Sequence, residues 1–303
     1  MIDAPRTELE LTPSDRLEIR GEAGERILAA TRRWFDAFGS RLFADLTSPQ
    51  QLPVRIDVRS LVTQHVGLGS GTQTALALAQ GLFRFFDHPT PPIDRLALGM
   101  GRGRRSAIGS HGHFRGGLLI DRGIDSNEAL SPLDLHLDFP DPWSILLVIP
   151  DAIRGLSGPP ERRAFEQLPP TPIDVERAML RCVADELVPA LCERNYERFA
   201  DAIYRFGLMS GGHFASVQQG PFNGPLLTEL VQSIRAAGIA AVGQSSWGPC
   251  IFAIAEDDEQ IESLLAQTES PWNALLGPGN YSIQKTHADN SGASIEPLQP
   301  REP

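Results

Sequence analysis

The residues best placed for chemistry form a glycine-rich loop, Val66-Gly67-Leu68-Gly69-Ser70-Gly71-Thr72-Gln73. Glycine at every second position lets the backbone turn tightly and brings its amides close to a ligand. The next segment is apolar with helical periodicity, and a helix there would add unpaired N–H groups and a positive dipole end. Ser70 and Gln73 have the spacing of a capping box, which places the helix start at Ser70. The loop is therefore a candidate phosphate or diphosphate site, with an ordinary glycine-rich turn as the alternative.

A second candidate is the basic segment Gly101-Arg102-Gly103-Arg104-Arg105-Ser106. Glycine on both sides of Arg102 keeps the backbone adaptable. A guanidinium group can bind phosphate or carboxylate oxygens through two parallel hydrogen bonds. We therefore expect Arg102, Arg104 and Arg105 to bind a multiply charged anion, with a solvated basic turn as the alternative.

Two further loops carry small residues suited to a binding site. The segment Gly243-Gln244-Ser245-Ser246-Trp247-Gly248-Pro249-Cys250 offers hydroxyls and amides to a sugar phosphate, or else simply connects a hairpin. Asp151 opens a stretch that contains the flexible turn Gly155-Leu156-Ser157-Gly158, which could fold over a site or be a plain loop. His111 and His113 form a His-x-His pair, but no third ligand with suitable spacing accompanies them, which disfavours a metal site.

Lysine is almost absent, because Lys285 is the only one in the chain. A Walker-type phosphate loop ends in Gly-Lys-Ser/Thr, and the loop at Gly67 lacks that lysine. A pyridoxal phosphate cofactor would need a Schiff base on Lys285, near the C-terminus. Neither chemistry fits this sequence.

The chain has 303 residues, 41% of them hydrophobic, and a net charge of −11. This composition can fill a core, and it disfavours a nucleic-acid or anionic membrane partner, because both need a broad basic surface. The longest apolar runs, such as 145–149, are too short to span a bilayer. The N-terminus lacks a signal pattern, and the three cysteines have no pairing or metal-ligand spacing, so we expect a cytoplasmic protein.

Periodicity predicts an α+β protein of two parts. Expected strands cover residues 7–11, 17–19, 54–58, 117–121, 143–149, 239–242, 251–255 and 281–285. Expected helices cover residues 24–38, the segment after the glycine loop, a short stretch ending at 99, two helices within 174–206, then 224–237 and 258–267. The run 139–142, Phe-Pro-Asp-Pro, is typical of a linker. We expect domains at residues 1–140 and 141–287, followed by a disordered tail at 288–303.

Four segments, taken together and in order, resemble β-ribofuranosylaminobenzene 5′-phosphate synthase, a family of the GHMP kinase superfamily. They are His65-Val66-Gly67-Leu68-Gly69-Ser70-Gly71-Thr72-Gln73, Gly101-Arg102-Gly103-Arg104-Arg105-Ser106-Ala107-Ile108-Gly109, Gly155-Leu156-Ser157-Gly158 and Gly243-Gln244-Ser245-Ser246-Trp247-Gly248-Pro249. The first is similar to the superfamily's phosphate loop, and the last occupies the place of its C-terminal glycine-rich motif.

The resemblance implies a two-lobed fold, with an N-terminal lobe like ribosomal protein S5 domain 2 and a ferredoxin-like C-terminal lobe. It also implies an enzyme that condenses 4-aminobenzoate with phosphoribosyl pyrophosphate in tetrahydromethanopterin biosynthesis. That reaction loses carbon dioxide and diphosphate. It passes through an oxocarbenium-like centre, so the protein must hold the leaving group and exclude water.

The reaction assigns roles to the candidate residues. We expect the amides of residues 67–71, with Ser70 and Thr72, to hold the diphosphate together with Mg²⁺. Arg102, Arg104 and Arg105 would neutralise the 5′-phosphate or the benzoate carboxylate. The remaining binding candidates, for the ribose and the ring, are Gln244, Ser245, Ser246 and Trp247. Asp151 would be a metal or hydroxyl partner.

The N-terminus departs from the family pattern. Members of the family begin earlier, with a strand and a glycine-rich stretch that runs into the equivalent of residues 2–5. We therefore expect an opening strand to be missing and an edge of the N-terminal sheet to be unpaired. A homodimer is compatible with the family. Two other functions stay open, an ATP-dependent small-molecule kinase and a non-catalytic protein that binds a phosphorylated metabolite.

Overall fold

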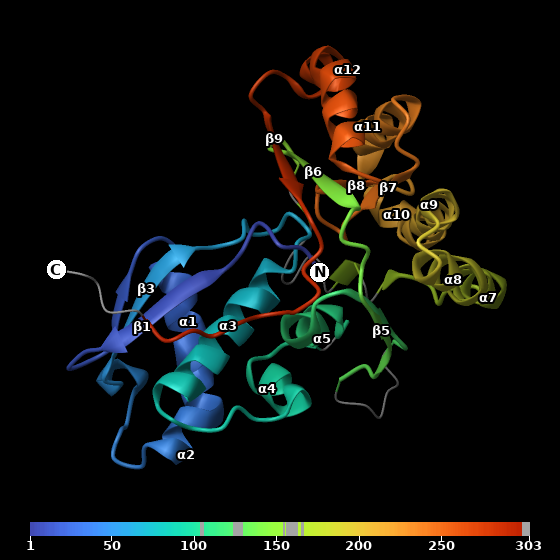
Figure 1. Ribbon diagram of the computed structural model, residues 1–303. Helices are drawn as coiled ribbons and strands as arrows, with labels where there is room; N and C mark the ends of the chain where they lie inside the picture. The colour runs from blue at the N-terminus through green and yellow to red at the C-terminus, as the bar shows by residue number, and fades with distance from the viewer. Residues whose placement is uncertain (104–105, 124–129, 154, 156–162, 165–166, 299–303) are drawn as a thin grey trace. The chain divides into compact units, whose positions relative to one another are not determined.

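The computed structural model describes residues 1–103, 106–123, 130–153, 155, 163–164 and 167–298, and it divides into two compact units (Figure 1). The first unit contains residues 1–62 and 69–138, together with the chain from Asp289 onward. The second contains residues 63–68 and 139–288. The expected linker near residue 140 thus lies where the chain passes between units. The first half of the glycine loop, however, groups with the second unit.

The first unit is built on a three-stranded sheet with the order β1-β3-β2, in which β1 pairs antiparallel and β2 parallel with β3. Alternation of apolar and polar residues along β3 sends Val54 and Ile56 into the core and leaves Arg55 and Asp57 on the other face. The strands are β1 (Glu8–Pro13), β2 (Glu18–Arg20) and β3 (Val54–Ser60).

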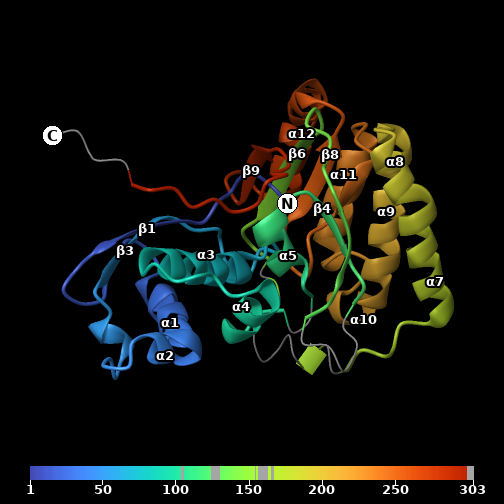
Figure 2. The ribbon, with the colours of Figure 1, turned by 60° about the horizontal axis from the view of Figure 1, so that its bottom comes forward.

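Helices α1 and α3 pack against each other (Figures 1 and 2). They bury Trp34, Leu82 and Phe83 in this core. The helical segments of this part are α1 (Gly24–Trp34), η1 (Phe35–Gly39), α2 (Ser40–Leu42), η2 (Pro49–Gln51), α3 (Ser70–Phe85), α4 (Ile93–Gly99) and α5 (Ile108–Arg115).

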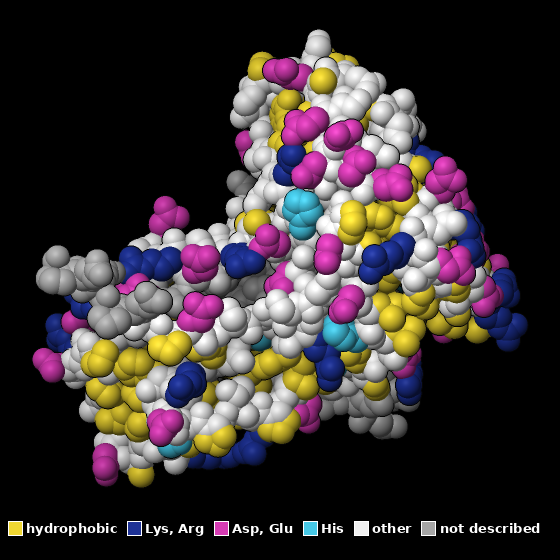
Figure 3. Space-filling model, viewed as in Figure 1, with side chains coloured by type: hydrophobic (Ala, Val, Ile, Leu, Met, Phe, Trp, Pro, Cys, Tyr) yellow, Lys and Arg dark blue, Asp and Glu magenta, His cyan; other side chains and the backbone are white. Residues whose placement is uncertain are grey.

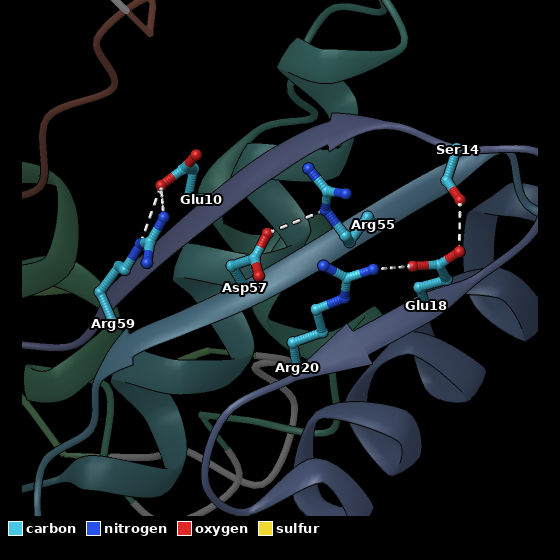
Figure 4. A network of polar contacts seen from close by, with 7 residues as sticks. All are labelled: Glu10, Ser14, Glu18, Arg20, Arg55, Asp57 and Arg59. Atoms are coloured by element: carbon cyan, nitrogen blue, oxygen red, sulfur yellow. Dashed lines mark hydrogen bonds and ion pairs between the residues drawn. The ribbon is translucent and has the colours of Figure 1, made fainter. Parts of the chain in front are cut away.

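The polar face of the three-stranded sheet carries paired charges (Figure 4). Arg59 pairs with Glu10 across β3 and β1, and Arg55 Nε lies 3.1 Å from Asp57 Oδ2 along β3. On β2, Arg20 and Glu18 pair at 2.9 Å. Half-exposed ion pairs such as these contribute about 0–1 kcal/mol each. Arg20, Arg55 and Arg59 on this face are therefore each paired with a carboxylate of the same sheet.

Two elements of the first unit were not expected from the sequence. These are helix α5 and strand β5 (Leu133–Leu137), which fall in stretches without clear periodicity. Strand β5 pairs antiparallel with β4 (Leu118–Asp121), which corresponds to the strand expected at residues 117–121. Asp121 at the end of β4 accepts a hydrogen bond of 3.1 Å from the amide of Ala107, which directly precedes α5. This carboxylate satisfies one of the unpaired amides at the start of the helix.

The first residues of the C-terminal tail are ordered, which corrects the expectation of disorder from residue 288. Asp289 donates from its amide to Met1 and accepts from Gly117, at 3.2 and 2.7 Å. Ala293 donates to the carbonyl of His113 at 2.7 Å. Residues 289–293 therefore pack on the first unit through main-chain hydrogen bonds.

The second unit contains a four-stranded antiparallel sheet with the order β7-β8-β6-β9. One face of this sheet packs on α11 and α12 through Leu146, Val148 and Ala253. The strands are β6 (Ser144–Pro150), β7 (Ala241–Gln244), β8 (Ile251–Ala255) and β9 (Tyr281–Thr286). This topology confirms the expected α+β class and the hairpin between the strands at 239–242 and 251–255.

The helical segments of the second unit are α7 (Ile173–Arg181), η3 (Cys182–Leu187), α8 (Val188–Cys192), α9 (Tyr196–His213), α10 (Ala215–Gln218), α11 (Gly224–Ala236) and α12 (Asp258–Leu276). Helix α12 runs well past its expected end at residue 267 and contains Pro271. Trp272 explains part of the extension, because it is fully buried and donates to Ser233 of α11 at 3.0 Å.

None of the described helices is both long enough and apolar enough to cross a membrane. On the face shown in Figure 3, acidic and basic side chains of the described residues are interspersed, and no broad basic stripe crosses it.

Candidate functional site

The first half of the glycine loop is held by the connection between β7 and β8, within the second unit. The carbonyl of Val66 accepts from the amide of Cys250 at 3.2 Å. The carbonyl of Gly67 accepts from Ser245 Oγ at 2.9 Å. Two of the four sequence motifs, far apart along the chain, therefore lie side by side.

A third motif reaches the same place through Gly155, whose amide donates to the carbonyl of His65 at 3.1 Å. The three segments approach so closely that only glycine fits. An added Cβ at Gly155 would lie 2.7 Å from the carbonyl oxygen of Trp247, and one at Gly248 would overlap the backbone of Val66 and Gly67. Leu156, Ser157 and Gly158 of this motif lie outside the described residues.

Two non-glycine residues near this junction have left-handed backbone conformations, His65 with φ 61° and Ser246 with φ 54°. Such conformations cost about 1–2 kcal/mol for ordinary residues and concentrate at functional sites. Ser246 and His65 are both exposed. Hydrogen bonds to the carbonyl groups of both residues stabilise these strained conformations and hold the two loops in a single conformation.

Gln244 and Trp247 support the β7–β8 connection from inside. Gln244 donates to the carbonyl of Ser246 at 2.8 Å and accepts from the amide of Asn223 at 2.6 Å. Trp247 is buried and packs edge-on against Phe214 with ring centroids 5.0 Å apart. The contacts of Gln244 therefore stabilise the connection between β7 and β8. Ser246 is the exposed residue of this motif.

The second half of the loop begins α3, in the first unit. Gly69 is the N-cap with φ 65°, and no side chain caps the helix. The capping box expected from Ser70 and Gln73 is therefore wrong, although the helix does begin at Ser70. The Gln73 side chain instead donates to the carbonyl of Gly109 at 2.9 Å, which joins α3 to α5.

The amides of residues 67–71 meet no acceptor among the described residues. Gly69 is exposed, and an added Cβ there would have no atom within 4 Å. A run of unbonded amides at the start of a long helix is the arrangement that binds phosphate oxygens. The local geometry therefore supports the anion-binding interpretation of this loop over an ordinary turn.

Arg102 lies at the same helix start. Its Nη1 would be 3.0 Å from an added Cβ at Gly71, so the guanidinium rests on the first turn of α3. Arg26 from α1 reaches this turn too, donating to the carbonyl of Ser70 at 2.5 Å and to Thr74 Oγ1 at 2.6 Å. Arg104 and Arg105 lie outside the described residues.

No described contact brings Asp151 to this loop, and His113 meets only the side chain of its last residue, Gln73. Asp151 is exposed, and its amide donates to the carbonyl of Asn280 at 2.8 Å. His113 is buried, and its ring nitrogens each lie 3.1 Å from a glutamine side-chain oxygen, those of Gln73 and Gln80. Burial lowers the pKa of His113 to about 4.

No group of three or more His, Cys, Asp or Glu side chains in the described part of the chain could hold a metal ion. The ring of His111 lies with Nε2 at 2.9 Å from the carbonyl of Ser131. The His-x-His pair therefore belongs to the packing around α5.

Sequence reasoning missed Arg26 and Asp121. Arg26 is an ordinary-looking arginine in an amphipathic helix, and nothing in its local pattern shows that it reaches Ser70, 44 residues away. Asp121 lies 14 residues after Ala107 in the chain, so no local capping pattern could have pointed to its contact with the start of α5.

Comparison with known proteins agrees with this architecture. Residues 27–115 match the family model described as GHMP kinases N terminal domain, and residues 187–274 match GHMP kinases C terminal. The beta-ribofuranosylphenol 5′-phosphate synthase of Methanothermobacter thermautotrophicus is 28% identical, covering 94% of this chain and 83% of its own. The Archaeoglobus fulgidus protein of the same name is also 28% identical, covering 85% of this chain and 79% of its own.

Solved structures of kinases share the fold. Homoserine kinase from Cytophaga hutchinsonii has a TM-score of 0.62 at 16% identity, covering 96% of this chain and 88% of its own. Mevalonate kinase from L. major, in complex with R-mevalonate, has a TM-score of 0.66 at 14% identity, covering 95% of this chain and 87% of its own. Identities this low show the fold alone. The chain belongs to the GHMP kinase superfamily, in the family of its beta-ribofuranosylphenol 5′-phosphate synthase relatives.

Proposed function

We propose that this protein is a synthase that joins phosphoribosyl pyrophosphate to a para-substituted benzoate, with release of carbon dioxide and diphosphate. One observation carries the proposal. The synthase of Methanothermobacter thermautotrophicus is 28% identical to this chain and covers 94% of it, whereas the two kinases of solved structure described above are only 14–16% identical to it.

The chemistry defines what the protein must supply. The bond between C1 of the ribose and the diphosphate oxygen breaks, and its electrons leave with the diphosphate. The ring carbon that bears the carboxylate then bonds to C1. Loss of carbon dioxide returns an electron pair to the ring, so no base is needed to remove a ring proton. The protein's tasks are to stabilise the departing diphosphate and to aim the ring at C1.

The loop at residues 67–71 is suited to the first task. Its unbonded amides lie at a helix start, where the dipole favours negative charge. We assign the diphosphate to these amides, with Arg102 as a charged partner beside Gly71. Ser70 and Thr72 are proposed as hydroxyl partners. Ser245, Ser246 and Trp247 are assigned to the ribose and the ring, because their segment is attached to Gly67.

We propose that Mg²⁺ accompanies the diphosphate. Mg²⁺ is commonly bound by substrate phosphates with one or two carboxylates and several waters, so it does not require a cage of protein ligands. The described residues provide no such cage, and the ion would be held mainly by phosphate oxygens. Asp151, which is exposed, is the proposed carboxylate partner.

The three free cysteines fit a reducing compartment, and we propose that the protein is located in the cytoplasm.

The acceptor is 4-aminobenzoate or its 4-hydroxy analogue. The relatives are named for a ribofuranosylphenol product, whose ring carries a hydroxyl group. Amino and hydroxyl groups both donate electrons to the ring carbon that must attack C1. Competition between the two benzoates for one pool of enzyme, with product identified by mass, decides which is preferred.

Ligand-induced stabilisation separates the synthase from the two rival functions. Phosphoribosyl pyrophosphate at one hundred times its Kd should stabilise the folded protein by about 2.7 kcal/mol, and ATP should not. Turnover should release labelled carbon dioxide from carboxyl-labelled benzoate and an equal amount of diphosphate from phosphoribosyl pyrophosphate. Stabilisation by ATP alone would support a kinase instead. Stabilisation by phosphoribosyl pyrophosphate without carbon dioxide release would support a non-catalytic binding protein.

A further inference from the structure

Three arginines from two separate segments lie close together beside the start of α3: Arg26 and Arg102 contact its first turn, and Arg33 contacts Gly101, the neighbour of Arg102. Arg26 and Arg33 are seven residues apart on α1, and this spacing places them on one face of the helix. Arg102 comes from the segment after α4. All three belong to the first unit, so their grouping depends on the fold of that unit alone.

Close approaches to glycine and to the main chain fix the grouping. Arg26 donates to Ser70, and Arg102 rests on Gly71, the next residue of α3. Arg33 lies directly against Gly101, where an added Cβ would overlap its Nη1 and lie 3.1 Å from its Cζ. Arg26 and Arg102 thus contact the adjacent residues Ser70 and Gly71, and Arg33 contacts Gly101, which directly precedes Arg102.

Within the described part of the chain, no carboxylate neutralises these three charges. No ion pair among the described residues includes any of these three arginines, whereas the arginines on the sheet face are paired with carboxylates. Nε of Arg102 is buried without a hydrogen-bond partner. Burial, and then the charges of Arg33 and Arg26, lower the pKa of Arg102. A partly buried guanidinium beside two like charges is costly, and a bound anion would offset that cost.

We propose that Arg26, Arg33 and Arg102 bind the diphosphate of the sugar substrate, a role that extends to α1 the site assigned above to the glycine loop. This inference rests on the proposed function for the identity of the substrate. The ligand class follows from charge, because diphosphate carries more negative charge than a single phosphate ester and spans two phosphoryl groups. Three guanidinium groups can bind both groups at once, each through charge-assisted hydrogen bonds.

Substitution of Arg33 gives the most direct test of the proposed arginine site. Its side chain is exposed, so Arg33→Gln should leave the fold intact, and Arg32→Gln makes the same charge change at the adjacent exposed residue of α1. Binding of inorganic pyrophosphate to the full-length protein is measured by calorimetry at fixed ionic strength. Loss of one charge-assisted contact should weaken pyrophosphate binding by about tenfold to a hundredfold in Arg33→Gln. Arg32→Gln should stay within about twofold, as expected for an exposed charge outside the site.

The same variants distinguish failure of the site from failure of the proposed function. Unchanged pyrophosphate binding in Arg33→Gln, or equal weakening in Arg32→Gln, would overturn the arginine site even if the enzyme turns over normally. Specific weakening in Arg33→Gln without any synthase activity in the unmodified protein would retain the site and reject the synthase. If both hold, Arg33→Gln should raise KM for phosphoribosyl pyrophosphate and leave KM for the benzoate unchanged.

Discussion

Ser245 Oγ donates a hydrogen bond of 2.9 Å to the carbonyl of Gly67, a residue 178 positions earlier in the chain. This bond attaches the connection between β7 and β8 to the glycine loop. Ser245→Ala should lower the free energy of unfolding by about 1 kcal/mol, the usual net contribution of such a bond. The variant should also raise KM for phosphoribosyl pyrophosphate, because the loop is less well fixed. Urea unfolding and steady-state kinetics measure the two effects. In the control Ser246→Ala, unfolding should be nearly unchanged, since Ser246 is exposed.

Gly67 is more sensitive to substitution than Gly69, although both have positive φ, 94° and 65°. An added Cβ at Gly67 would overlap the carbonyl oxygen of Ser245, and backbone cannot move aside as a side chain can. Gly67→Ala should therefore lower the free energy of unfolding by about 3 kcal/mol or more, from left-handed strain plus overpacking. Gly69→Ala meets no atom and should cost only about 1 kcal/mol of strain. Equal costs in chemical denaturation would contradict the observed packing of residue 67.

Elements with strong periodicity were predictable from the sequence, and the site's three-dimensional connections were not. The strand at residues 251–255 was predicted with its observed bounds, because apolar residues fill it. Helix α5 was not predicted, because its buried residues include His111, Gly112 and His113, which are residue types more typical of a polar loop than of a buried helix. The glycine loop could be identified from spacing alone. Its attachment to Ser245 could not, because that contact depends on how the second unit folds.

Stability should fall in mild acid because of His113. Burial lowers its pKa from 6.5 to about 4, with only the neutral amides of Gln73 and Gln80 at its ring nitrogens. The unfolded chain therefore binds a proton between pH 6.5 and 4 that the folded protein does not, and stability decreases as pH falls through this window. The contribution is at most about 3 kcal/mol. His113→Gln should have a flatter dependence of unfolding free energy on pH than the unmodified protein. Parallel curves would show that His113 is not the titrating group.

Thiol reactivity should be confined to Cys192 in the folded protein. Cys192 is exposed, whereas Cys250 is fully buried and its pKa is raised to about 12 by burial. Burial also raises the pKa of Cys182. Because the thiolate is the reactive form, iodoacetamide at pH 8 should modify one cysteine in the native protein and three after unfolding. Cys192→Ser should abolish the native reaction, and fast modification of Cys250 would contradict its burial.

Gly71→Ala should separate stability from ligand binding. Gly71 lies in the first turn of α3, where alanine favours the helix by about 0.5–1 kcal/mol over glycine. The added methyl group would lie 3.0 Å from Nη1 of Arg102, the flexible end of a side chain that can shift by a few tenths of an ångström. We therefore expect unchanged or slightly raised stability, together with a several-fold weaker affinity for pyrophosphate as Arg102 is displaced. The matched control is Gly207→Ala in α9, where the added Cβ meets no atom within 4 Å and no arginine is displaced. Calorimetric titration and urea unfolding of both variants test this, and undiminished binding in Gly71→Ala would show that Arg102 does not contact the anion from its observed position.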